Sequence, residues 1–179
     1  MITQLNRAAF ALLLTAGLTA CDGGTATSSK EQQKRAEPAS LPLVALGQTG
    51  SKDGVELTIT DVATPTQVGS TGHGEKAELG ETFVVVRYTM KNVGSKPLTF
   101  MDRPGLTLLD AGGNGYAVDN AASITATFMT EGLSGEASDL NPNVSAKAIE
   151  VWKVDKAAFD RATWKVRLDT PSKPLFALQ

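Results

Sequence analysis

Apolar and polar residues alternate with a period of two in several short stretches of the chain, a pattern that predicts half-buried β-strands. Residues 55–59 alternate in this way, and residues 81–92 form the longest such stretch. We expect one face of residues 81–92 to be buried in the core, and this face consists of Val84, Val86, Tyr88 and Met90. If the opposite face, which carries Val85, is only partly covered, Val85→Asp should be milder than Val86→Asp.

Further strands are expected near residues 106–109, 116–118, 148–154, 164–168 and 175–178. Turn residues separate these stretches, and in one case the pair Asn114-Gly115 suits a hairpin turn that needs positive φ. Residues 155–160 are expected to form a single helical turn.

Two segments are harder to assign. Residues 69–80 are polar and rich in glycine, and we expect them to form a loop. The segment 119–139 is ambiguous, because Ile124, Ala126 and Phe128 alternate as in a strand, whereas residues 121–129 are also compatible with a helix.

About seven short strands, with turn residues between them and without a long helix, predict an all-β protein built as a β-sandwich. The low aromatic content, 6%, is compatible with this fold class. We place the folded domain at residues 44–179.

The first 21 residues have a different character. Arg7 precedes an apolar run over residues 8–18, and Leu18-Thr19-Ala20 leads directly to Cys21, the only cysteine. This arrangement resembles the signal peptide of bacterial lipoproteins, which implies cleavage before Cys21 and lipid attachment to its thiol, with acyl chains such as palmitate. A transmembrane anchor needs about 20 apolar residues, more than this run provides. An ordinary cleaved signal peptide over residues 1–20 would leave the position of Cys21 to chance.

Residues 21–43 are interpreted as the lipidated cysteine and a flexible, disordered tether, because they are polar and offer no apolar face. We therefore expect an exported protein that is lipid-anchored to a bacterial membrane and faces the periplasm or the cell exterior. The net charge of −2, without a Lys/Arg cluster, argues against a nucleic-acid partner.

Several motifs of the domain occur in the order seen in a known family. These are the strand Gly80–Asn92, the leucine strand that ends at Asp110 with its Gly-Asn-Gly turn and Tyr116, the step Leu140-Asn141-Pro142, and the final apolar strand. Together they resemble an immunoglobulin-like domain of unknown function found in many bacterial lipoproteins, related in fold to a secreted mycobacterial immunogenic antigen. The resemblance covers about residues 44–179 and implies an immunoglobulin-like antiparallel β-sandwich without catalytic residues. Asn143 departs from the family, which usually has Gly there.

Candidate metal sites are poorly supported by the sequence. His73 is the only histidine, so a metal bound there would rest on carboxylates, and we interpret it as a solvated loop residue. The spacing of Asp110 and Asn114 is similar to part of a calcium loop, but the twelfth position is Ala121, where a bidentate Glu is needed. We interpret Asp110 and Asn114 as hairpin-turn residues.

Candidate catalytic and sugar-binding residues are also poorly supported by the sequence. Glu75, Glu78 and Glu81 offer carboxylates for hydrolysis, but spacing alone does not distinguish them from ordinary surface residues. Trp152 and Trp164 lie on expected strands, so we interpret them as core or half-core residues and not as sugar-stacking platforms. No cofactor or metal is expected.

The sequence therefore favours a membrane-anchored cell-envelope lipoprotein whose domain is a non-catalytic protein-binding or structural module. Its partner would be another envelope protein or a wall component, bound through the segments 69–80 and 119–139. One alternative is a sensor domain for a small molecule or ion, which predicts a concave pocket with convergent polar groups. Another is a hydrolase without a recognisable motif, which predicts a carboxylate or histidine with a strongly shifted pKa.

Overall fold

The structure is a computed structural model that describes residues 42–70, 72–130, 133 and 138–179. Cys21, the predicted signal peptide at 1–20 and nearly all of the predicted tether at 21–43 lie outside the described residues. Within the described part of the chain, no helix is both long and apolar enough to cross a membrane.

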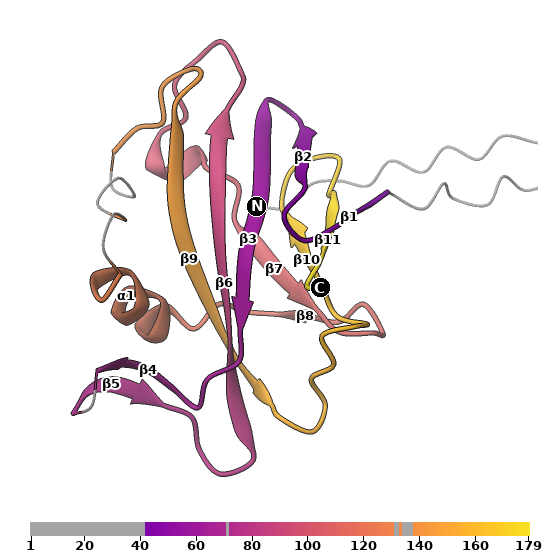
Figure 1. Cartoon of the computed structure of the whole chain (residues 1–179). Helices are drawn as coiled ribbons and strands as arrows, with labels where there is room; N and C mark the ends of the chain where they lie inside the picture. The colour runs from indigo at the N-terminus through magenta and orange to yellow at the C-terminus, as the bar shows by residue number, and fades with distance from the viewer. Residues whose placement is uncertain (1–41, 71, 131–132, 134–137) are drawn as a thin grey trace, which may run out of the picture. The chain divides into compact units, whose positions relative to one another are not determined.

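Two sheets form an all-β sandwich, as predicted (Figure 1). The first sheet is antiparallel, with the order β2 (Thr49–Lys52), β3 (Val55–Ala63), β6 (Glu81–Asn92) and β9 (Ser145–Asp155). The second has the order β1 (Leu43–Val44), β11 (Leu175–Ala177), β10 (Lys165–Leu168), β7 (Leu106–Leu109) and β8 (Gly115–Tyr116). Its pair β1–β11 is parallel, which departs from the purely antiparallel prediction.

Three further elements complete the domain. A separate hairpin consists of β4 (Gln67–Ser70) and β5 (His73–Lys76). The helix α1 covers Asn120–Phe128, and the short 3₁₀ helix η1 covers Phe100–Asp102. The described residues thus contain eleven strands, more than the seven or so expected, because several pair over only two to four residues.

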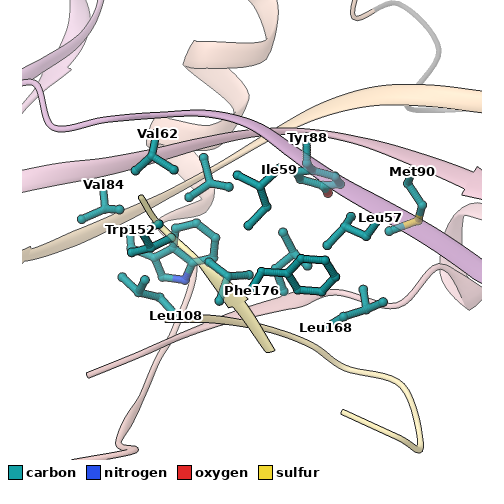
Figure 2. Packing of buried hydrophobic residues seen from close by; sticks show 14 of the residues in the cluster. Leu57, Ile59, Val62, Val84, Tyr88, Met90, Leu108, Trp152, Leu168 and Phe176 are labelled. Carbon is teal, nitrogen blue, oxygen red and sulfur yellow. The ribbon is translucent and has the colours of Figure 1, made fainter. Parts of the chain in front are cut away.

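The main core fills the space between the two sheets. The alternation in β3 and β6 places Leu57 opposite Met90 and Val62 opposite Val86 on the inward face, despite a bulge between Ile59 and Asp61. Apolar side chains of both sheets meet there, among them Leu57, Ile59, Val62, Val84, Leu108, Trp152, Leu168 and Phe176 (Figure 2). The predicted buried face of β6 is confirmed.

The opposite face of β6 is more buried than expected. Phe83 and Val85 have exposed fractions of only 1% and 3%, because α1 and the β4–β5 hairpin cover them. With Ile149 and Val151 of β9 they belong to a second apolar cluster on the outer face of the four-stranded sheet. A partly covered face, the condition for a milder effect of Val85→Asp, is therefore not met over this half of the strand.

Three local predictions also need correction. The segment 69–80 is not a loop, since its first part belongs to the β4–β5 hairpin. The ambiguous segment 119–139 contains α1. In the hairpin between β7 and β8 the positive φ of +83° belongs to Gly113 and not to Asn114-Gly115. The single helical turn predicted at 155–160 is present, with the Phe159 amide donating to the Asp155 carbonyl at 3.1 Å.

Candidate functional site

Helix α1 begins after Asp119, which acts as its N-cap. The Asp119 carboxylate accepts a hydrogen bond from the Ala122 amide at 3.0 Å, which satisfies one of the free amides of the first turn. After the helix ends, the Thr130 hydroxyl donates to the Ala126 carbonyl at 2.9 Å. Residues 120–128 carry no charge, and a helix of this length is marginal alone, so it depends on tertiary packing.

That packing fixes α1 to strand β9. The buried side of the helix presents only Ala122 and Ala126, whose small side chains permit a close approach. The Ser123 hydroxyl accepts a hydrogen bond from the Val151 amide at 3.0 Å, and the Asp119 amide donates to the Val151 carbonyl at 2.8 Å. Because β9 is an edge strand of its sheet, these bonds protect backbone groups that would otherwise be open to another strand.

The outward side of α1 carries the larger apolar residues. Ile124 and Phe128, four positions apart and hence on one helical face, have exposed fractions of 57% and 83%, and the adjacent Met129 is 53% exposed. A surface helix ordinarily turns its bulky apolar residues inward and its polar residues outward. Here that polarity is reversed, and we call Ile124, Phe128 and Met129 the helix surface.

The β4–β5 hairpin lies against α1, in close contact with it (Figure 1). A Cβ at Gly69 would lie 2.6 Å from Cγ2 of Thr125, and Gly69 also has a φ of +93°, so only glycine permits this approach. Val68 is buried in the cluster beneath the helix. The structure thus brings together residues of the two segments predicted to form the binding surface, 69–80 and 119–139, as a hairpin and a helix.

A pocket of about 350 Å³ lies where α1, the hairpin and β6 meet. Its lining is largely uncharged and includes Val68, Gly69, Ala126 and Met129. Arg87 of β6 also lines it, and its guanidinium pairs with the Asp61 carboxylate at 2.7 Å. This pair is partly exposed, so it contributes little stability.

The candidate metal and hydrolytic residues do not form a centre. His73 is exposed on β5, so the solvated interpretation holds although the residue is on a strand and not in a loop. Glu75 and Glu78 are also exposed. Glu81 accepts a hydrogen bond from the Glu78 amide at 3.1 Å, a local turn contact. Among the residues described, no group of three or more His, Cys, Asp or Glu is arranged to hold a metal ion.

Asp110 and Asn114 form a hairpin turn. The Asp110 carboxylate accepts hydrogen bonds from the side chain and the backbone amide of Asn114, both at 2.8 Å, and these bonds lower the pKa of Asp110. Trp152 and Trp164 are core residues, with exposed fractions of 0% and 3%. Trp164 also stacks on Tyr116, with ring centroids 4.8 Å apart. Cys21, the predicted lipid attachment site, lies outside the described residues.

Sequence reasoning missed a second pocket of about 250 Å³ on the inward face of β6 and β9, where Tyr88 and Glu150 meet. The Tyr88 hydroxyl donates to the Glu150 carboxylate at 3.2 Å. A signal for it exists in the strand expected at 148–154, since Glu150 has the same parity as the buried Trp152. Carboxylates are rarely buried, so a carboxylate on the core-facing side of a strand is a signal that sequence analysis can use.

The fold and these surfaces define a β-sandwich domain with one helix docked on the outside of a sheet. The chain is 37% identical over 123 residues to the uncharacterised protein YxkC of Bacillus subtilis (strain 168), covering 68% of this chain and 68% of that protein, and it belongs to the same family. A comparison with models of known protein families gives no match.

Two solved structures have the same fold. A conserved hypothetical protein from Bacillus anthracis matches with a TM-score of 0.64 and 24% identity, over 74% of this chain and 94% of that one. An uncharacterised β-sandwich protein from Clostridium difficile 630 matches with a TM-score of 0.52 and 14% identity, over 80% and 99%. At these identities the likeness establishes the fold alone.

Proposed function

We propose that this chain is an exported, lipid-anchored protein of the bacterial cell envelope whose β-sandwich binds another envelope protein and catalyses no reaction. The attachment point is Cys21, after the Leu18-Thr19-Ala20 box, with residues 22–43 as the tether. The resemblance of the domain's motifs to those of immunoglobulin-like domains of bacterial lipoproteins supports this placement. The site of binding is the helix surface.

The reversed polarity of α1 is the observation that carries the proposal. The fold needs only Ala122 and Ala126 at the contact with β9, so Ile124 and Phe128 contribute little to the core in their exposed positions. Adjacent exposed apolar side chains that do not serve packing are typical of protein interaction sites. Aromatic residues and methionine, the types present here, are enriched in such interfaces.

The frame that holds the helix surface also favours binding. Both hydrogen bonds to Val151 and the glycine-mediated contact with the hairpin fix α1 before any partner arrives. A preorganised surface loses less conformational entropy on association than a flexible loop does. The proposed role therefore requires no rearrangement of the domain.

Site-specific photo-crosslinking tests the proposal in intact envelopes. A photoreactive phenylalanine analogue at position 128 should trap one defined protein, and the same analogue at position 43 should not. Leu43 is the matched control, because it is an exposed apolar residue (50%) on the other sheet. The trapped protein is then purified, and Phe128→Ser should weaken its binding at least tenfold whereas Leu43→Ser leaves it unchanged. Equal crosslinking from both positions, or unchanged affinity of Phe128→Ser, contradicts the proposal.

A further inference from the structure

Small residues line the pocket beside α1 on three of its sides. These are Ala63 at the end of β3, Gly69 of the β4–β5 hairpin and Ala126 of α1. Val85 of β6, which pairs with Ala63 in the sheet register, also lines the pocket and is buried. The volume, about 350 Å³, lies near the lower end of the range of about 300–1,000 Å³ for ligand pockets. The pocket therefore has room for one compact group and not for a long segment of chain.

A single charged residue, Arg87, lines this pocket, and the other lining residues are uncharged. It lies two positions after Val85, on the same outer face of β6. Its Nη1 pairs with the Asp61 carboxylate at 2.7 Å, whereas neither Nε nor Nη2 forms a hydrogen bond within the described part of the chain. A guanidinium has five N–H donors in an arrangement that suits carboxylates, so Arg87 retains donors for a second carboxylate.

The remaining polar groups of the lining determine where an anion can lie. The Gln67 side-chain amide donates to the Ser70 carbonyl at 3.0 Å, and the Thr130 hydroxyl donates to the Ala126 carbonyl, so both are engaged locally. The C-terminal end of a helix carries partial negative charge, which disfavours an anion against the wall formed by the end of α1. A bound anion is therefore directed to Arg87, and an apolar group to Val68, Ala126 and Met129.

We propose that this pocket binds the C-terminal residue of the partner protein, a residue with a large apolar side chain such as leucine. Its carboxylate is recognised by the Arg87 guanidinium, and its side chain occupies the apolar remainder of the pocket. This inference rests on the proposed function, because Met129 belongs both to the helix surface and to the pocket lining. A protein that covers the helix surface therefore reaches the pocket as well.

A chain terminus fits the pocket better than an internal acidic residue does. Adjacent side chains of an extended segment point to opposite sides, so the acidic neighbour of an apolar residue would point away from the pocket. A C-terminal residue instead carries its apolar side chain and its carboxylate on the same Cα atom. One residue can therefore satisfy both the cationic and the apolar part of this small space.

Four acetylated peptides test the recognition chemistry by titration of the isotopically labelled full chain. They are acetyl-Gly-Gly-Leu, its C-terminal amide, acetyl-Gly-Gly-Ser, which lacks the apolar side chain, and acetyl-Leu-Asp-amide, whose carboxylate belongs to the neighbouring residue. We expect saturable chemical-shift changes with acetyl-Gly-Gly-Leu at Val68, Val85 and Arg87, and at least tenfold weaker binding of the other three peptides. Any of those three that binds as tightly as acetyl-Gly-Gly-Leu, or no saturable change with acetyl-Gly-Gly-Leu up to its solubility, overturns the proposal.

Variants locate the site. Arg87→Gln should weaken the binding of acetyl-Gly-Gly-Leu at least tenfold and should bind this acid and its amide equally. Lys91→Gln is the matched control and should bind normally, because the Lys91 ammonium pairs with the Glu56 carboxylate at 3.9 Å on the same face of β6 but outside the pocket. Ala63→Leu should abolish binding by filling the space. Thermal melting verifies folding, and Arg87→Gln carries the test if Ala63→Leu does not fold. Normal binding by folded Ala63→Leu, or an unchanged preference of Arg87→Gln for the acid, excludes this pocket.

The crosslinking experiment at position 128 separates this inference from the proposed function. A partner trapped there, together with no binding of acetyl-Gly-Gly-Leu, overturns the inference and leaves the proposed function in place. Binding of the peptide at the pocket without any trapped partner contradicts the proposed function, while the recognition of an apolar C-terminal residue stands.

Discussion

The side-chain amide of Asn92 donates a hydrogen bond of 2.8 Å to the carbonyl oxygen of Leu140, 48 positions further along the chain. Asn92 ends strand β6 and is only 1% exposed, yet all its hydrogen-bonding groups are used. The same Nδ2 donates to Lys96 at 2.7 Å, and Oδ1 accepts from the Gly94 amide at 2.9 Å. A single buried amide thus joins the end of β6, the turn after it and the segment before β9.

We predict that Asn92→Ala lowers the free energy of unfolding by about 3 kcal/mol, because it removes the three hydrogen bonds that the buried side-chain amide makes to Lys96, Leu140 and Gly94. Equilibrium denaturation with urea measures this. Asn114→Ala is the control, since its side chain bonds Asp110 in an exposed turn, and it should cost less than about 1 kcal/mol. Equal losses of unfolding free energy in the two variants would show that Asn92 contributes no more to stability than an exposed turn residue does.

Val85→Asp and Val86→Asp should both prevent stable folding. Each places a carboxylate in an apolar cluster, Val85 beneath α1 and Val86 between the sheets, at a cost of several kcal/mol against a total stability of about 5–15 kcal/mol. Circular dichroism melting curves test this. Thr89→Asp, on the same face as Val85 but only half buried, should melt within a few degrees of the wild type. A cooperative, near-normal transition for Val85→Asp would mean that α1 is not docked as described.

The pH dependence of stability should include a contribution from Asp53. The backbone amide of Ser172 donates to its carboxylate at 3.0 Å, which lowers the pKa of Asp53 below the ordinary value of 3.8. A lowered pKa in the folded state means that this contribution is present above about pH 4 and is lost as the pH falls through the folded pKa. Asp53→Asn retains a residue type that tolerates the φ of +53° at this position. It should melt below the wild type at pH 7, and the two should converge as the pH falls below the folded pKa of Asp53. A constant difference would assign the effect to something other than ionisation.

Cys21→Ser should abolish lipid attachment and leave the chain uncut between Ala20 and Cys21. Metabolic labelling with a fatty-acid analogue, followed by gel analysis of the precursor, measures both. A serine substitution elsewhere in the predicted tether, such as Ala26→Ser, should be labelled and processed normally. Equal labelling of Cys21→Ser and the wild type would contradict the lipoprotein prediction.

Most strands were predictable because their alternation is local, and β6 begins and ends at the predicted residues. Helix α1 was ambiguous because its large apolar residues face outward and its buried side is alanine. The spacing of the apolar residues therefore does not mark the buried face of a helix. The β4–β5 hairpin was concealed by its glycines, of which Gly69 is required by the approach of Thr125. The Tyr88–Glu150 pocket depends on the register between β6 and β9, which no local pattern contains.

Asn143 lies in the turn before β9 and has a left-handed backbone conformation. Its φ is +65°, in the left-handed region that glycine adopts freely and asparagine tolerates. Its amide donates to the Asn92 carbonyl at 2.7 Å. Asparagine at position 143, where the resemblance predicts glycine, is therefore compatible with the backbone conformation of the turn.

The parallel pairing of β1 with β11 places the first strand of the domain beside its last strand. Leu43 lies beside Leu175, and the last residue, Gln179, is only four positions further, about 13 Å in extended chain. In a domain cut to begin at Leu43, a short Gly/Ser linker can therefore join Gln179 to Leu43, and the chain can be reopened at the exposed Gly113 turn without breaking a pair of the four-stranded sheet. A cargo or an anchor can therefore be attached to this domain at a new position without a change in how its strands pair.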